Sequence, residues 1–144
     1  MSEQIGITPE SFWAFSGTTL GNFRKNAYLD ETNSVVYDKR RNSQHLFAST
    51  YFDTELQVAV NVAAMRAVEY FDLPIIIAGD LDIQYKRDRR LPKGVVFPVS
   101  QLWVPRAELS REQIEDKLLR RRTGTARDRS REVFIAVNPE SFLL

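Results

Sequence analysis

The residues most able to do chemistry in this sequence are basic, and they gather in its second half. Residues 84–131 hold 14 Lys and Arg against 6 Asp and Glu, whereas residues 1–83 hold 6 against 11. Such asymmetry indicates an anionic partner, either nucleic acid or an acidic protein surface. Two groups supply the candidate nucleic-acid-binding side chains: Lys86, Arg87, Arg89, Arg90 and Lys93 in one, and Arg120, Arg121, Arg122, Arg127, Arg129 and Arg131 in the other.

These two groups would form one phosphate-binding surface if the fold brought residues 86–93 and 120–131 to the same edge. Tyr85 or Trp103 would then be available to stack on bases. The alternative is that the basic residues only solvate a helix and two loops, which is the usual role of a charge run. The short cluster Lys39-Arg40-Arg41 is typical of a solvated turn.

Acidic residues and one lysine nearby suggest a different chemistry. Asp72 precedes an apolar run, and Asp82 and Lys86 lie in the alternating segment that follows it. This order of an acid, a hairpin and then Gln-x-Lys resembles the metal-dependent nuclease core of the PD-(D/E)XK type. The resemblance implies that the two aspartates hold a divalent ion and that the lysine helps to orient the attacking water. Gln84 stands where that family has an acid, and Asp80 reads as part of a Gly-Asp turn.

The order helix, three strands, helix over residues 54–122 also resembles double-stranded-RNA-binding domains. That resemblance implies recognition of phosphates and 2′-hydroxyls by shape. Those domains place basic residues at a helix start, whereas the arginines here lie at the end of the second helix of this order.

Hydrophobic periodicity predicts the elements that must position these residues. From about residue 54 the order is α-β-β-β-α-β, which predicts a single α+β domain. A basic connection over residues 87–93 separates the second expected strand from the third. The strands are expected at residues 73–78, 82–86, 95–104 and 133–137.

The central helix is predicted over residues 54–71. Thr54 and Gln57 have the spacing of a capping box. Apolar residues then surround the helix on nearly every face, which is typical of a helix that is buried all round. We therefore expect Val62→Asp to unfold the domain, because it would bury an unpaired charge.

A second helix is predicted over residues 109–122. Ser110 is its expected N-cap, Gln113 completes a capping box, and Gly124 lies just past the end. The basic segment 127–131 is expected to be a loop. An apolar tail at residues 142–144 is expected to dock on the core or on a partner.

Residues 1–52 are expected to form an N-terminal helix followed by irregular or hairpin structure. Thr8-Pro9-Glu10 has the form of a helix start. The small polar segment 16–22 lacks the lysine and spacing of a P-loop, so we interpret it as a plain connector. Residues 35–37 and 46–48 fit either two strands or helical structure.

Composition excludes several classes of protein. A chain of 144 residues is long enough for one core. It has no cysteine, which excludes a disulfide framework, a thiolate zinc site and a thiol nucleophile. His45 is the only histidine, so the sequence predicts no metal site built on histidines and no Ser/His/Asp triad. No cofactor motif, signal peptide or membrane span is apparent, and a cytoplasmic location is expected by default.

We therefore expect a non-catalytic module that binds nucleic acid or another polyanion, within a larger assembly, through the basic residues 86–93 and 120–131. The competing hypothesis is a structural subunit of a homo-oligomer or of a larger particle such as a virion. It would use the basic face and the apolar tail for contacts between subunits, with the acidic residues 1–83 of a neighbouring copy as one partner surface. The metal-dependent nuclease is the third hypothesis.

Overall fold

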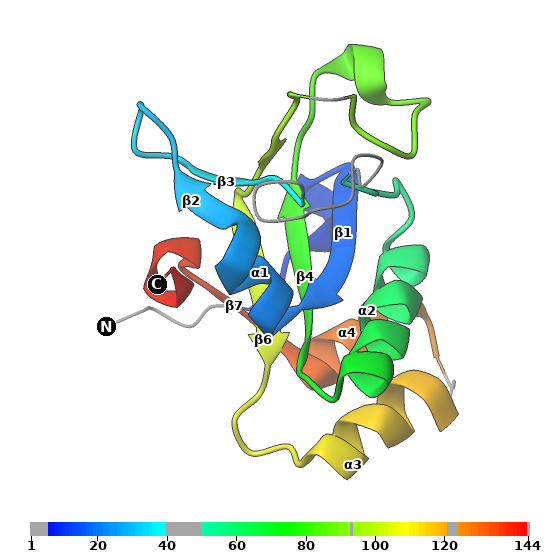
Figure 1. Cartoon of the computed structure of the whole chain (residues 1–144). Helices are drawn as coiled ribbons and strands as arrows, with labels where there is room; N and C mark the ends of the chain where they lie inside the picture. The colour runs from blue at the N-terminus through cyan, green and yellow to red at the C-terminus, as the bar shows by residue number, and fades with distance from the viewer. Residues whose placement is uncertain (1–5, 40–49, 93, 121–123, 144) are drawn as a thin grey trace.

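A four-stranded antiparallel sheet lies at the centre of the computed structural model (Figure 1). The structure describes residues 6–39, 50–92, 94–120 and 124–143. The sheet has the strand order β1-β4-β6-β7, and its strands are β1 (Ala14–Thr19), β4 (Pro74–Gly79), β6 (Gln101–Pro105) and β7 (Phe134–Val137). Helices and strands thus share one domain, and the predicted α+β class is confirmed.

The two faces of this sheet are covered by different elements. One face carries α2 (Leu56–Tyr70), α3 (Arg111–Glu115) with the π-helical turn that continues it (Asp116–Arg120), and α4 (Ala126–Val133). The other face carries α1 (Leu20–Asn26) and a second sheet of β2 (Ala27–Leu29), β3 (Val35–Tyr37) and β5 (Phe97–Pro98). Short 3-10 turns complete the chain at Pro9–Ser11, Ile83–Tyr85 and Pro139–Phe142. No helix in the described ranges is long and apolar enough to span a membrane.

Strand β4 is buried on both faces, which explains why its sequence is a continuous apolar run. Successive side chains of a strand point to opposite faces. Ile76 packs with the helices, whereas Ile75 and Ile77 pack with the second sheet, and all three are fully buried. A strand buried on both faces shows no alternation of polar and apolar residues.

Helix α2 confirms the predicted central helix, but the prediction that it is buried all round is wrong. Its inner face is buried, and Val60 is fully covered. Its outer face is open, with Met65 63% exposed and Val62 only partly buried. The N-cap is Glu55 and makes no side-chain cap hydrogen bond, so the capping box expected from Thr54 does not form.

The helix signals around residue 110 are confirmed. Ser110 Oγ accepts from the Gln113 backbone N–H at 3.1 Å, and Gln113 Oε1 accepts from the Ser110 backbone N–H at 2.8 Å. Gly124 has a φ of 81°, a conformation that glycine adopts readily. The start of this helix is thus fixed by local chemistry, whereas residues 121–123, which include its expected end, lie outside the described ranges.

Several predicted segments have a different structure. The expected connector 16–22 forms most of β1 and the start of α1. The expected strand 82–86 contains the 3-10 turn Ile83–Tyr85 and pairs with no strand of the described ranges. The expected loop 127–131 lies inside α4, which begins with a capping box formed by Thr125 and Asp128. The expected strand 95–104 is divided between β5 of the second sheet and β6 of the first.

The two ends of the described chain pack on the core. The expected N-terminal helix is only the 3-10 turn Pro9–Ser11. Phe142 and Leu143 are half-buried against the second-sheet side of the core, so this part of the apolar tail docks on the domain itself. The strand expected at 35–37 is β3, whereas residues 46–48 lie outside the described ranges.

A buried tyrosine between α1 and the second sheet gives the fold a testable dependence on pH. Tyr37 is 2% exposed, its hydroxyl oxygen accepts from Asn22 Nδ2 at 2.7 Å, and its ring stacks on Phe23. Burial raises the pKa of Tyr37 to about 12 from an ordinary value of 10.0. The folded state therefore holds this proton more tightly than the unfolded state does.

Alkaline unfolding should report this difference. The contribution of Tyr37 is fully present below pH 10 and is lost as the pH rises from 10 through 12, by about 3 kcal/mol in total. We expect urea midpoints of the parent chain to fall more steeply over this window than those of Tyr37→Phe. Parallel pH profiles for the two proteins would show that Tyr37 does not titrate with a raised pKa.

Candidate nucleic-acid interface

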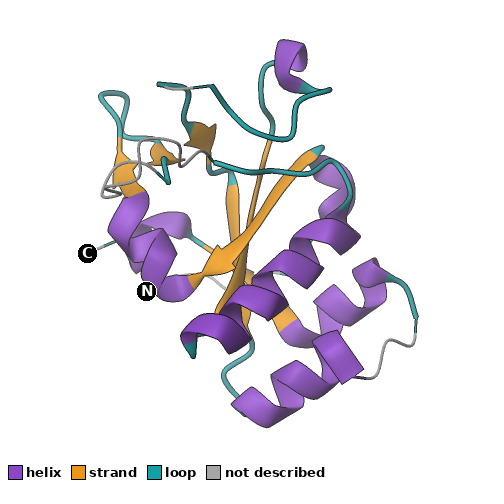
Figure 2. Cartoon of the chain, turned by 45° about the vertical axis from the view of Figure 1, so that its right-hand side comes forward, coloured by secondary structure: helices purple, strands orange, loops and turns teal. Residues whose placement is uncertain are grey.

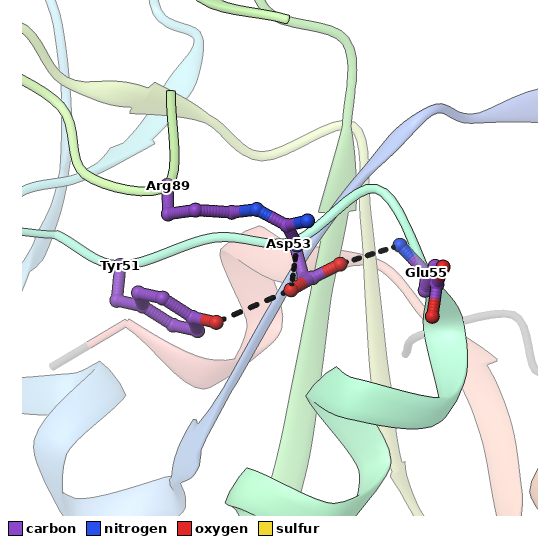
Figure 3. A network of polar contacts seen from close by, with 4 residues as sticks. All are labelled: Tyr51, Asp53, Glu55 and Arg89. Carbon is purple, nitrogen blue, oxygen red and sulfur yellow. Dashed lines mark hydrogen bonds and ion pairs between the residues drawn. The ribbon is translucent and has the colours of Figure 1, made fainter. Parts of the chain in front are cut away.

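Asp53 is the buried centre of a polar network just before α2 (Figure 3). Its side chain is 1% exposed, and its backbone N–H and C=O both pair with Phe15 at 2.8 Å. The carboxylate accepts hydrogen bonds from the Glu55 backbone N–H at 2.8 Å and from the Tyr51 hydroxyl at 3.2 Å, and it forms an ion pair with Arg89. A buried charge is costly without such partners. The network therefore fixes Tyr51 and Arg89 relative to α2.

Backbone pairing holds two arginines of the first predicted group beside this network. The Phe52 N–H donates to the Arg89 carbonyl oxygen at 2.9 Å, and Tyr51 and Arg90 form an antiparallel bridge. The side chain of Arg89 is nevertheless 56% exposed, and Arg90 is exposed as well. Both guanidinium groups thus remain accessible on a fixed backbone.

Two further cations join these arginines from other parts of the chain. Burial lowers the pKa of the Lys39 ammonium, and the like charges of Arg66 and Arg90 lower it further. Lys39 follows β3, where its backbone N–H donates to Thr50 Oγ1 at 3.1 Å, and Arg66 projects from α2. We call the set Lys39, Arg66, Arg89 and Arg90 the cation cluster.

The cation cluster keeps a surplus of positive charge. Arg66 pairs with Glu69 at 3.0 Å, and Arg89 pairs with the buried Asp53. The other two members have no carboxylate partner within the described ranges. Four cations therefore face two carboxylates, which leaves two positive charges for an anion from outside.

Tyr51 is the aromatic residue beside the cation cluster. Burial raises the pKa of Tyr51, and its hydrogen bond to Asp53 and the charge of that carboxylate raise it further. The hydroxyl therefore stays protonated and donates to Asp53. The prediction that Trp103 is available for stacking is wrong, because Trp103 is fully buried under the helices. Tyr85 is half-buried against the core.

The rest of the first predicted group extends from the cation cluster into solvent. Lys86 and Arg87 follow the 3-10 turn Ile83–Tyr85 and are exposed. Lys93 lies outside the described ranges. Their contact with nucleic acid stays a prediction.

The second predicted group, residues 120–131, comes after β6, which leaves the sheet at the other end. Because β4 and β6 are antiparallel, the segment after β4 and the segment after β6 leave the sheet at opposite ends (Figure 1). Arg120 pairs with Glu115 at 3.8 Å. Arg121 and Arg122 lie outside the described ranges. The strand order therefore does not bring the two predicted loops to one edge.

Arg127 and Arg131 line an open cleft of about 750 Å³ between the N-terminal ends of α2 and α4. One carboxylate, that of Glu10, pairs with Arg127 at 2.9 Å and with Arg131 at 3.6 Å. Glu55 and Asp128 also line the cleft. Three carboxylates against two guanidinium groups make this cleft a poor place for a polyanion.

Arg129 is not on the surface, as binding to nucleic acid would require. It is 3% exposed, on the inner side of α4. Among the described residues, its Nε and Nη1 have no hydrogen-bond partner, and neither does Oδ1 of Asn61 on α2, the helix that packs against α4. The guanidinium is thus part of the contact between helices.

The residues of the nuclease resemblance lie apart. Asp72 precedes β4 and accepts from the Gly21 backbone N–H at 2.8 Å, whereas Asp82 follows β4 and accepts from the Gln84 backbone N–H at 3.3 Å. A six-residue strand between them spans about 20 Å, so the two carboxylates cannot share one ion. Within the described ranges, no group of three or more His, Cys, Asp or Glu side chains could hold a metal.

No family model, curated protein or solved structure matches this chain. Its function is therefore inferred from the geometry of the site.

Sequence analysis missed the residues that organise the site. Tyr51 and Asp53 lie in a segment that carries no motif, and Lys39 reads as part of a solvated turn. Arg66 forms an ion pair with Glu69 on α2, which alone gives no sign of a site. What joins these residues is packing between segments far apart in the sequence, for which a single sequence has no signal.

Proposed function

We propose that this protein is a non-catalytic module that binds nucleic acid or another polyanion within a larger assembly. The observation that carries the proposal is the convergence of the cation cluster, whose four members come from three separate parts of the chain. Burial is the main cause of the lowered pKa of Lys39, and repulsion by the like charges of Arg66 and Arg90 lowers it further. An anionic ligand would relieve that repulsion.

The chemistry of the cluster suits phosphate. An arginine guanidinium can donate two parallel hydrogen bonds to one phosphate, and lysine adds a compact charge. Asp53 orients Arg89, and backbone pairing fixes Arg90, so little freedom is lost when an anion binds. The ring of Tyr51 lies beside these groups and is suited to stacking on a base.

A salt titration with a fluorescently labelled oligonucleotide tests the proposal. Each phosphate contact releases counterions, so affinity should fall steeply with salt. We expect the double variant Lys39→Gln/Arg90→Gln to bind more weakly and to reduce the slope of log K against log salt by about 1.8 on duplex or about 1.4 on a single strand. Arg89 is left unchanged, because removing it would leave the carboxylate of Asp53 buried and unpaired.

The matched control is Arg127→Gln/Arg131→Gln, which removes two cations from the acidic cleft. We expect this control to retain the parental slope to within about 0.5. Equal slopes and affinities for the parent and the cluster variant, with both proteins folded by circular dichroism, would contradict the proposal.

A structural role in an assembly is the second candidate function. It is favoured by the exposed apolar side chains toward the end of α2, which include Met65 at 63% and Phe71 at 79%. Exposed apolar groups that lie together often mark protein contacts. Sedimentation of the parent and of Lys39→Gln/Arg90→Gln tests whether an assembly forms through the basic face, because its mass would then change in the variant. A change in mass without any oligonucleotide binding would favour assembly over nucleic-acid binding.

A further inference from the structure

Helix α2 has a second apolar face, opposite the one that packs on the sheet. Val58, Val62 and Met65 follow each other at i, i+4 and i+7, a spacing that places them on one side of a helix. We call these three residues the outer stripe. In Figure 2, α2 crosses in front of the strands, and no described element lies over its outer side. Met65 is 63% exposed, and Val58 and Val62 are only partly buried, so the domain leaves part of the stripe accessible.

Phe71, the residue that follows α2, extends this apolar surface beyond the C-terminal end of the helix. Phe71 caps the helix with a φ of 50° and a ψ of 53°, a left-handed conformation that bulky residues seldom adopt. Its ring is 79% exposed, so burial in the core does not explain a phenylalanine there. Backbone strain of this kind often accompanies a functional surface. Arg111 lies 4.3 Å from the centre of the ring and places a positive charge beside it.

Positive charge also borders the C-terminal half of the outer stripe. Arg66 lies next to Met65 on α2, and the charge of Arg66 acts on Lys39 of the cation cluster. Glu69, four residues after Met65, lies on the same side and is paired with Arg66 at 3.0 Å, and the exposed Glu55 precedes Val58 by three residues. Cations thus lie beside the C-terminal half of the outer stripe and next to Phe71.

We propose that the outer face of α2 is a docking surface for an acidic amphipathic helix of a partner protein. The apolar side chains of such a helix would cover the outer stripe and Phe71, and its carboxylates would meet Arg66, Lys39 and Arg111. Helices commonly bind grooves and faces through anchors at i, i+3, i+4 and i+7. This inference goes beyond the proposed polyanion binding and does not depend on it.

A second copy of the chain fits this surface less well. Two α2 helices packed face to face would bring two copies of Arg66 and Lys39 together, and like charges across an interface oppose association. The acidic helix α3 has no free apolar side, because Ile114 and Leu118 are buried in its own core. Charge complementarity therefore favours a different, acidic partner.

Methionine labelling gives a direct test with a designed probe. The chain has two methionines, Met1 and Met65, so a ¹³C-methyl spectrum assigns Met65 by comparison with Met65→Leu. The probe is an 18-residue peptide with leucines at i, i+4, i+7 and i+11, glutamates beside them and alanines elsewhere to favour the helix. We expect a saturable shift of the Met65 methyl signal with this peptide, and none with a matched peptide that has lysines in place of the glutamates.

Two serine variants provide the matched control, with binding followed by the anisotropy of the labelled acidic peptide. Val62→Ser removes an outer-stripe side chain and is expected to weaken binding about tenfold. Ile83→Ser removes an apolar side chain that is 78% exposed on the 3-10 turn after β4, and is expected to bind like the parent. Arg66→Gln is expected to weaken binding about threefold.

Three results would overturn the inference. One is a dissociation constant weaker than about 1 mM for the acidic peptide. Another is equal binding of the acidic and basic peptides, or equal loss in Val62→Ser and Ile83→Ser with both proteins folded. The third is a parent chain that sediments as a dimer and becomes a monomer in Val62→Ser, which would identify a second copy as the occupant. No nucleic acid is present in this experiment, so its outcome is separate from that of the salt titration.

Discussion

Gly17→Ala is expected to lower the free energy of unfolding by about 3 kcal/mol or more. A Cβ atom at Gly17 would lie 2.1 Å from the carbonyl oxygen of Ala59 and 2.7 Å from the backbone nitrogen of Ala63. Both atoms belong to the backbone of α2, so no side-chain rotation relieves the clash. The helix would have to move away from β1, and the buried alanines between them would lose their close packing.

Urea denaturation of Gly17→Ala and Gly6→Ala measures this effect against a matched control. A Cβ atom at Gly6 meets nothing within 4 Å, so that variant carries the same chemical change without a clash. We expect Gly6→Ala to unfold at the parental midpoint or slightly above it, because alanine restricts the unfolded chain. Equal midpoints for the two variants would contradict the close contact of α2 with β1.

The same contact bears on the candidate site. Arg66 belongs to α2, whereas Lys39 follows β3 on the other side of the four-stranded sheet. The packing of α2 over β1 holds Arg66 where its charge acts on Lys39. A Gly17→Ala protein that remains folded should therefore also lose affinity for the oligonucleotide, although the substitution touches none of the cations.

Elements with strong local signals could be predicted from the sequence. The capping box of Ser110 and Gln113 depends on residues three apart, and the apolar run of β4 depends on burial on both faces. The α+β class follows from such elements. The capping box of Thr125 and Asp128 was also present in the sequence, but the arginines around it favoured a solvated loop.

Other features depended on contacts between distant segments. Ser16 and Gly17 are typical turn residues, yet they lie in β1, where the missing side chain of Gly17 lets a helix approach. Trp103 looked available for stacking because sequence alone does not reveal that the helices cover it. The cation cluster likewise needs the packing of β3, α2 and the segment before α2.

The two faces of α2 give the last prediction. Val60 is fully buried, whereas Val62, two residues later, is only partly covered. We expect Val60→Asp to lower the free energy of unfolding by more than about 4 kcal/mol, because the carboxylate would be buried without a partner. From the sequence alone, Val62→Asp is expected to unfold the domain. In the structure its carboxylate can turn into water, so we expect it to lower the free energy of unfolding by about 1 kcal/mol or less.

Thermal melts of these two variants separate an inner from an outer face on one helix with one kind of substitution. Val62→Asp also places a negative charge where the acidic peptide would dock, so we expect it to remain folded and to lose peptide binding. If Val62→Asp unfolded as readily as Val60→Asp, α2 would be covered on both sides, and the outer stripe could not be a docking surface. If Val60→Asp were tolerated, the packing of α2 on the sheet would be wrong.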